Sequence, residues 1–158
     1  MLDHVTIGVS DIERSKTFYD SALRPLGIER LYADGPTFAG YGAGRKAFFW
    51  IGLRNASQTS AHVAFTAEDR ETVQQFHRAA LAAGGQDNGP PGLRPHYHEN
   101  YYGAFILDPD GHNIEAVCHC KPEHDPEKWE PVFRKDHAPT KNTLESDSTQ
   151  LNQTLVSR

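Results

Sequence analysis

The sequence predicts an α+β fold made of two β-α-β-β-β modules. The first observation is an internal repeat, in which residues 4–27 align without a gap with residues 62–85. The second is that each copy begins with a strand pattern and continues into a helical pattern. The third is a hairpin pattern at the end of the second copy, ILDPDGHNIEAV at residues 106–117. Together they predict two paired modules that form one curved mixed sheet around a cavity, with helices on its convex face.

Side chains alternate between two faces in the first strand of each module. In the first module, the apolar positions 5, 7 and 9 share one face, and His4 and Thr6 share the other. We expect the apolar face to pack under the helix, so that His4 and Thr6 point to the concave side. The same alternation places His62 on the concave side of the second module.

The remaining elements follow from periodicity and turn residues. A first helix is predicted to begin at Ser10 and Glu13, which have the capping-box spacing, and to end at residues 25–27. A second helix is predicted over about residues 69–83. Further strands are predicted over residues 31–32, 37–41 and 46–53 and in the hairpin, with a long loop over residues 84–103.

The chain has 158 residues, enough for one domain with a hydrophobic core. We expect this domain to cover residues 1–120, with modules over about 1–54 and 61–120. The tail, residues 121–158, is polar and poorly periodic, so we expect it to be partly disordered.

Composition narrows the possible partners and the location of the protein. The net charge of −5 and the lack of a dense basic run argue against nucleic acid. No apolar run approaches the roughly 18 residues of a membrane span. The two cysteines are too few for a disulfide framework, and the first residues do not resemble a signal peptide. A cytoplasmic protein that binds a small molecule, and neither nucleic acid nor membrane, is therefore expected.

Three polar residues are predicted to point into one cavity. Glu115 lies in the middle of the second hairpin strand, where alternation places it on the concave side with His4 and His62. A buried carboxylate is costly unless it is paired or binds a metal. Two histidines and a carboxylate on rigid strands suit one divalent ion, namely Fe(II), Mn, Co, Ni or Zn. The alternative explanation for Glu115 is an ion pair with an arginine such as Arg45.

The chain resembles the vicinal oxygen chelate superfamily, which includes glyoxalase I, extradiol dioxygenases, fosfomycin-resistance transferases and bleomycin-resistance proteins. The resemblance covers residues 1 to about 119 and depends on LDHVTIGVSDIERSKTFYDSAL, HVAFTAEDRETVQQFHRAAL and LDPDGHNIEAV. It implies a glyoxalase-like fold around a metal cavity, with metal ligands at His4, His62 and Glu115. It also implies a homodimer, sometimes with exchanged modules.

Several departures separate the chain from particular members of that superfamily. The fourth ligand of glyoxalase I would fall near Phe48, where KAFFWIGL contains no carboxylate. Extradiol dioxygenases have a further histidine before the second ligand, and no histidine precedes His62 in GLRNASQTSA. Thr6 matches a threonine of the fosfomycin transferases, but their potassium-binding loop is not recognisable here. Bleomycin-binding members lack the metal triad.

Residues 93–103, LRPHYHENYYG, are rich in side chains that can serve a substrate. We expect His96, His98 and Tyr101 to act in acid–base chemistry beside Glu115. The expected substrate-binding residues are Thr6, Arg94, Tyr102, Phe48 and Trp50.

The predicted function is that of a metal-dependent lyase or isomerase acting on a small oxygen-chelating substrate. An extradiol-type ring-cleaving dioxygenase that uses Fe(II) is one alternative. A non-catalytic protein that sequesters a small aromatic molecule is another, which would need no metal.

Overall fold

The structure, a computed structural model, describes residues 2–54 and 60–121. The predicted tail therefore lies outside the described residues, except for Lys121. The first module contains β1 (Val5–Val9), α1 (Ile12–Ala22), a short 3-10 helix η1 (Arg24–Leu26), β2 (Glu29–Asp34), β3 (Phe38–Ala43) and β4 (Lys46–Leu53). The second contains β5 (His62–Thr66), α2 (Arg70–Ala82), β6 (Gln86–Leu93), β7 (Tyr102–Leu107) and β8 (Asn113–Cys118).

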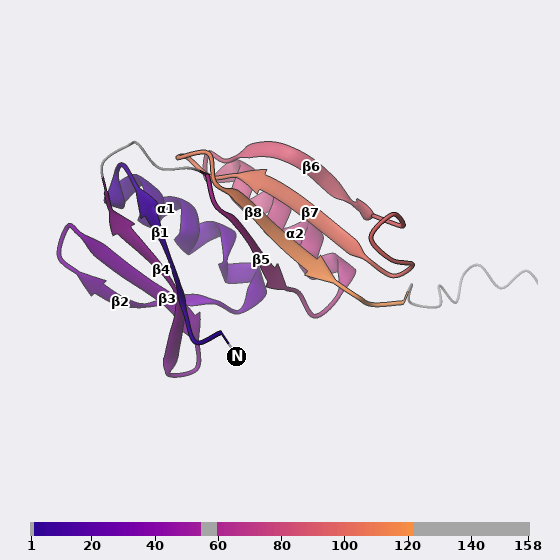
Figure 1. Cartoon of the computed structure of the whole chain (residues 1–158), viewed down its shortest axis with the longest axis horizontal. Coiled ribbons are helices and arrows are strands. Elements are labelled where there is room, and N and C mark those ends of the chain that lie inside the picture. The colour runs from indigo at the N-terminus through magenta and orange to yellow at the C-terminus, as the bar shows by residue number, and fades with distance from the viewer. Residues whose placement is uncertain (1, 55–59, 122–158) are drawn as a thin grey trace, which may run out of the picture. The chain divides into compact units, whose positions relative to one another are not determined.

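Each module forms a four-stranded mixed sheet with one α-helix packed on it (Figure 1). The strand orders are β1-β4-β3-β2 and β5-β8-β7-β6, and the β1–β4 and β5–β8 pairs are parallel. The predicted α+β class and the two β-α-β-β-β modules are confirmed. Among the described strands, none from one sheet pairs with a strand of the other. The expected curved sheet therefore consists of two separate sheets within one chain, and they do not close around a cavity.

The predicted long loop over residues 84–103 is wrong in its first half. Residues 86–93 form β6, which pairs with β7 through an irregular register that shifts at Gly89. Pro90 and Pro91 are compatible with this strand because β6 lies at the edge of its sheet, where outward-facing positions need no N–H donor. The Gly- and Pro-rich composition hid the strand from sequence analysis.

The first helix begins one residue later than the capping-box spacing predicted. Asp11 is the N-cap, and its carboxylate accepts hydrogen bonds from the backbone N–H groups of Glu13 and Arg14. Ser10 instead donates through its N–H and its hydroxyl to Asp110. The predicted capping box is therefore replaced by a single aspartate cap and a contact with the second module.

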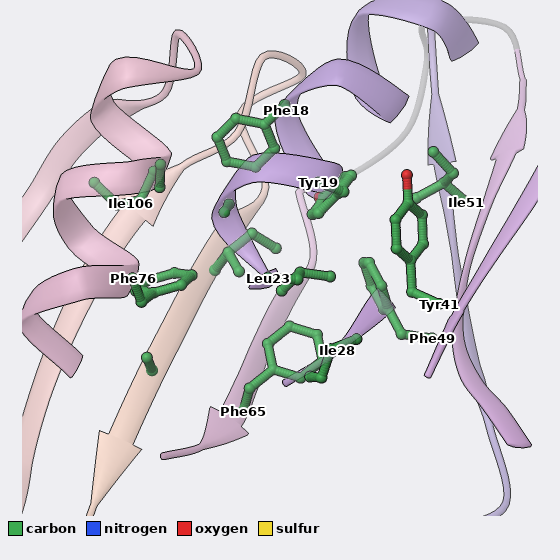
Figure 2. Packing of buried hydrophobic residues seen from close by; sticks show 14 of the residues in the cluster. Phe18, Tyr19, Leu23, Ile28, Tyr41, Phe49, Ile51, Phe65, Phe76 and Ile106 are labelled. Atoms are coloured by element: carbon green, nitrogen blue, oxygen red, sulfur yellow. The ribbon is translucent and has the colours of Figure 1, made fainter. Parts of the chain in front are cut away.

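The core is continuous between the two modules (Figure 2). Phe18 and Tyr19 on α1, and Leu23 at its C-cap, are fully buried. Phe49 of β4 and Phe65 of β5 meet edge to face, with ring centroids 5.2 Å apart. Burying a large apolar side chain contributes about 1.5–3 kcal/mol. The apolar faces predicted for β1 and β5 are thus the faces that bind the modules together.

The turn between β7 and β8 attaches the second module to the first. Gly111 has a φ of 84°, which closes the turn as the DPDG pattern predicts. Asp108 is buried and accepts hydrogen bonds from the N–H groups of Asp110 and His112 and, at 2.6 Å, from the hydroxyl of Tyr19 on α1. The acidic residues of this motif are therefore structural.

His112 completes this attachment. Its Nδ1 accepts from the N–H of Ala61 at 2.9 Å, and its Nε2 lies 2.7 Å from the carbonyl oxygen of Gly8, to which it donates. Both ring nitrogens of this buried residue are thereby satisfied by the backbone before β5 and within β1. The hairpin that carries Glu115 is thus fixed relative to both first strands.

Candidate metal centre

Glu115 is a buried carboxylate on β8. Its side chain is 2% exposed, and the flanking Ile114 and Ala116 are fully buried in the core on the other face of the strand. Tyr101 donates its hydroxyl to Oε1 of Glu115 at 2.5 Å, and Nε2 of His62 lies 3.2 Å from Oε2. None of the described arginines, Arg45 included, forms an ion pair with Glu115. The partners of this buried negative charge are thus a phenol and an imidazole.

His62 is oriented by a side chain behind it. The amide nitrogen of Asn113 lies 2.6 Å from Nδ1 of His62, and the amide oxygen of Asn113 accepts from Asn88 at 3.1 Å. Nε2 is then the nitrogen that faces Glu115. The amide NH2 of Asn113 donates to Nδ1, so Nε2 carries the ring proton; a metal ion bound through Nε2 would require Nδ1 to donate its N–H instead, to the amide oxygen of a turned Asn113.

His4 is placed on the first module, and its side chain is 57% exposed. Its Nδ1 lies 3.0 Å from Asp3, whose other carboxylate oxygen accepts from Lys46 at 2.6 Å. The hydrogen bond from Lys46, followed by that from His4, lowers the pKa of Asp3 to about 2. Within residues 2–54 and 60–121, no three His, Cys, Asp or Glu side chains form a group that could hold a metal ion. The structure thus brings His62 and Glu115 together and places His4 apart from them.

Tyr101 is held against Glu115 by its surroundings. The ring of Tyr97 packs against it at 4.9 Å, and those of His98 and His119 at 5.4 and 5.3 Å. Burial, followed by the hydrogen bond to Glu115 and its negative charge, raises the pKa of Tyr101 well above its ordinary value. The phenol therefore keeps its proton and acts as a hydrogen-bond donor at neutral pH.

Gly103 on β7 provides the space for this pair. A Cβ atom at position 103 would lie 2.9 Å from Oε1 of Glu115 and 3.2 Å from Cε1 of Tyr101. Any other residue would therefore push against the carboxylate or the phenol. The absence of a side chain at Gly103 therefore allows the Tyr101 hydroxyl to reach the Glu115 carboxylate.

The two predicted acid–base histidines lie in different surroundings. Nε2 of His98 is 2.7 Å from Nδ1 of His119, and the N–H of Asn100 donates to Nδ1 of His98. This leaves Nε2 of His98 as the donor to His119. His96 packs its ring on Tyr97 at 4.3 Å. His98 therefore ties the β6–β7 loop to the residue that follows β8, and neither histidine contacts Glu115 directly.

The predicted substrate-binding residues fall into three groups. The first group, Thr6, Phe48 and Trp50, lies on the first module. Thr6 is opposite Trp50 in the β1–β4 register, and Trp50 stacks on Tyr32 with ring centroids 5.6 Å apart. Phe48 lines a cavity of about 450 Å³ together with His4. Tyr102 contacts α2, through Arg70 and Gln74, on the helix-covered side of its sheet. Arg94 lies over the ring of Phe105.

Phe105 and Asn113 are the site residues that sequence reasoning missed. Phe105 is directly opposite Glu115 in the β7–β8 register, and its ring stacks on that of His62 at 6.3 Å. Strand alternation back from Glu115 across the hairpin turn could have identified Phe105. Asn113 lies two residues before Glu115 on the same face, so the same alternation could have identified it as the partner of His62.

The donor set fits a divalent ion in part. An imidazole nitrogen and a carboxylate oxygen lie 3.2 Å apart, and Tyr101 holds the other oxygen of Glu115. Asn113 contacts His62 through its amide nitrogen and would have to present its oxygen to Nδ1 when Nε2 binds an ion. A metal ion would also neutralise the buried charge of Glu115. Two protein ligands are fewer than the three that open catalytic sites commonly use. The His62–Glu115 pair therefore supplies part of a metal centre.

Comparison with solved structures defines the class of fold. The chain is similar to a glyoxalase/bleomycin resistance protein from Albidiferax ferrireducens T118, with 34% identity and a TM-score of 0.64 over 73% of this chain and 96% of that one. It is also similar to a glyoxalase/bleomycin resistance protein/dioxygenase family enzyme from Burkholderia phytofirmans PsJN, with 25% identity and a TM-score of 0.58 over 73% and 96%. Lactoylglutathione lyase from Agrobacterium tumefaciens, at 16% identity and a TM-score of 0.56 over 74% and 92%, shares the fold.

A match to a sequence-family model shows the family to which the chain belongs. The model of the Glyoxalase/Bleomycin resistance protein/Dioxygenase superfamily matches residues 1–116. The chain belongs to this superfamily, whose members commonly use a divalent metal and bind small molecules. A search of curated proteins finds no match. In the part of the chain that the structure describes, no helix is long and apolar enough to span a membrane.

Proposed function

We propose that the protein is a metal-dependent enzyme, of lyase or isomerase type, that acts on a small oxygen-chelating substrate. The observation that carries the proposal is the environment of Glu115. A carboxylate that is 2% exposed lies between the hydroxyl of Tyr101 and Nε2 of His62, with no permanent positive charge bonded to it. A metal ion bound by His62 and Glu115 would compensate this charge.

We further propose that His4 of a second copy of the chain supplies the third ligand. Within one chain β1 pairs only with β4, and β5 only with β8, among the described strands. The edge strands β2 and β6 carry features that discourage pairing with another strand: β2 has charged residues, and β6 contains Pro90 and Pro91. The edge strands β1 and β5 contain neither prolines nor Asp, Glu, Lys or Arg. Pairing of β1 with β5 of a second chain in a homodimer would bring His4 to the His62–Glu115 pair.

The residues of the chain would have separate roles at such a centre. His62 and Glu115 would bind the ion, Asn113 would orient His62, and Tyr101 would hold one oxygen of Glu115. A divalent ion there would act as a Lewis acid that stabilises negative charge developing on a chelated substrate oxygen. Because Tyr101 retains its proton, we assign it to holding the carboxylate and not to general-base catalysis.

Aromatic side chains on the first module support the proposal of a small-molecule substrate. Trp50 lies flat over Gly40, where a Cβ would come within 2.6 Å of the indole, and its ring stacks on Tyr32. Thr6 is opposite Trp50 in the register, and Phe48 lies near His4. In the proposed dimer, these side chains would form the wall of the cavity opposite His62 and Glu115.

Metal content tests the proposal. The chain is purified without a metal-affinity column, and each transition metal is counted per chain by mass spectrometry. We expect about one ion per chain in the wild type and strong loss in His62→Ala and Glu115→Gln. Glu71→Gln, which removes an exposed carboxylate on α2 that pairs with Arg78, is the matched control and should retain the metal. A wild-type protein that is purified without metal and then fails to bind added Fe(II), Mn, Co, Ni or Zn would refute the proposal.

A binding protein for a small aromatic molecule is a second candidate, favoured by one observation. Tyr32, Phe38 and Trp50 form an aromatic surface on the first module, and Tyr32 and Phe38 are exposed. Such a surface would bind a planar ligand without a metal. Saturable binding of an aromatic compound by metal-free protein would favour this candidate.

A further inference from the structure

Arg94, the residue that follows β6, is held without an acidic partner. Its Nη2 donates to the carbonyl oxygen of Pro90 at 2.7 Å, and its Nη1 to that of Leu93 at 3.3 Å. No carboxylate within residues 2–54 and 60–121 forms an ion pair with it. Asp87, the acidic residue of β6, pairs with His77 instead. The guanidinium therefore has a fixed position and a positive charge that no described side chain neutralises.

The backbone beneath the guanidinium is shaped to receive it. Cβ atoms at Gly89 and Gly92 would lie 3.4 Å from Nη2 and 2.9 Å from Nη1 of Arg94. Side chains at these positions would crowd the guanidinium, so the two glycines of β6 create its place. Two backbone carbonyls thus accept hydrogen bonds from the guanidinium at the edge of the sheet, and two glycines leave room for it.

Phe105 connects this cation to the proposed metal ligands. The guanidinium carbon of Arg94 lies 5.6 Å from the centre of the Phe105 ring. The same ring stacks on His62, and Phe105 is directly opposite Glu115 in the β7–β8 register. Arg94 therefore lies on the same face of the second sheet as His62 and Glu115, with one aromatic ring between them.

We propose that Arg94 binds an oxyanion of the substrate, a carboxylate or a phosphate, while two neighbouring oxygens of the same substrate face His62 and Glu115. The planar guanidinium has five N–H donors, of which the structure uses two, and the others suit the paired oxygens of such a group. This inference rests on the proposed function, because it assigns the second contact of the same substrate. It specifies an acidic substrate in place of a neutral one.

Hydroxamates provide the test, because they chelate a metal ion through two oxygens and their binding can be measured without knowing the true substrate. The probes are acetohydroxamate, the monohydroxamates of malonic, succinic and glutaric acid, and their counterparts with a terminal phosphonate. Cobalt-loaded protein is titrated with each, and the visible cobalt spectrum gives the dissociation constants. The graded chain lengths sample the separation between the anion and the chelating oxygens.

The readout is the ratio of dissociation constants between acetohydroxamate and the best anionic probe in the same protein. We expect the wild type to prefer an anionic probe by about tenfold, as for a charge-assisted hydrogen bond, and Arg94→Gln to lose this preference. Arg45→Gln, which removes an exposed charge from the turn between β3 and β4, should keep it. Preference for the carboxylate or the phosphonate series identifies the oxyanion.

The outcomes separate this inference from the proposed function. A wild type that binds cobalt and acetohydroxamate but shows no preference for any anionic probe would overturn the role of Arg94 alone. A preference that survives in Arg94→Gln would also overturn it. Failure of the wild type to bind cobalt would instead refute the proposed metal centre.

Discussion

Replacing Tyr101 with phenylalanine should weaken metal binding without unfolding the protein. The substitution removes only the hydroxyl that donates to Oε1 of Glu115 at 2.5 Å. The ring remains packed among Tyr97, His98 and His119. The carboxylate, which is 2% exposed, then loses its uncharged donor and the partner that fixes its orientation.

The expected size of the effect follows from the charge and burial of the acceptor. A hydrogen bond to a charged group contributes about 1.5–3 kcal/mol. Removal of an outer partner of a metal ligand typically costs about 10- to 100-fold in metal affinity. Without the donor, Oε1 is free to turn toward the ion, but the carboxylate is also no longer held in the orientation that presents Oε2 toward His62, and we expect the second effect to dominate. Tyr101→Phe should therefore bind cobalt or zinc about 10- to 100-fold more weakly.

Calorimetric titration of metal-free protein measures this change. Tyr97→Phe is the matched control, because it removes a hydroxyl from a ring that packs on Tyr101 but is itself 58% exposed. Its metal affinity should equal that of the wild type. If Tyr101→Phe also binds metal like the wild type, the hydroxyl does not support Glu115, and the reasoning about the buried carboxylate is refuted.

Three further predictions concern the structure around the site. Tyr19→Phe should lower the free energy of unfolding by about 1.5–3 kcal/mol in urea titration, because it removes a donor from buried Asp108; no change would mean that this contact contributes little. Gly103→Ala should cost about 1–3 kcal/mol and weaken metal binding, since its Cβ would meet Oε1 of Glu115; wild-type stability would contradict this. The backbone hydrogen bond from Thr72 lowers the pKa of Asp69, the N-cap of α2, below its ordinary value of 3.8. The contribution of the Asp69 carboxylate to stability is therefore present above pH 3.8 and is lost as the pH falls through the lowered pKa. Asp69→Asn should therefore lose less stability than the wild type on acidification.

The sequence was informative where a periodic pattern and a buried face coincide. Alternation in β1 and β5 correctly assigned the buried faces, because shifting a strand by one residue would expose its whole apolar set. The position of Glu115 between apolar residues predicted a partly buried carboxylate, and the DPDG pattern predicted its hairpin. The repeat identified the two modules before any residue was assigned a role.

The sequence does not predict the features that depend on contacts between residues far apart in the chain. Gln86–Leu93 was not predicted as a strand because its prolines and glycines are tolerated only at a sheet edge, which depends on the topology. Ser10 was misassigned as a cap because its partner, Asp110, lies in the other module. The pairing of Tyr101 with Glu115 depends on the path of the β6–β7 loop, which no period describes.

The position of His4 shows a different limit. Alternation gave the face of each sheet on which His4, His62 and Glu115 lie, but not how the sheets are arranged. In the structure, His62 and Glu115 meet, and His4 directly precedes β1 of the other sheet. A triad inferred from facing directions alone therefore leaves open whether one chain or two provide it.

Complementation between two inactive variants tests the central claim most directly. His4→Ala and His62→Ala, each with a different affinity tag that binds no metal, are refolded together, and the mixed dimer is isolated through both tags. Each variant alone should bind little metal. If the site takes His4 from one chain and His62 with Glu115 from the other, the mixed dimer contains one intact site and should bind half as much metal as the wild type. A mixed dimer that binds no more metal than either variant alone would contradict the account.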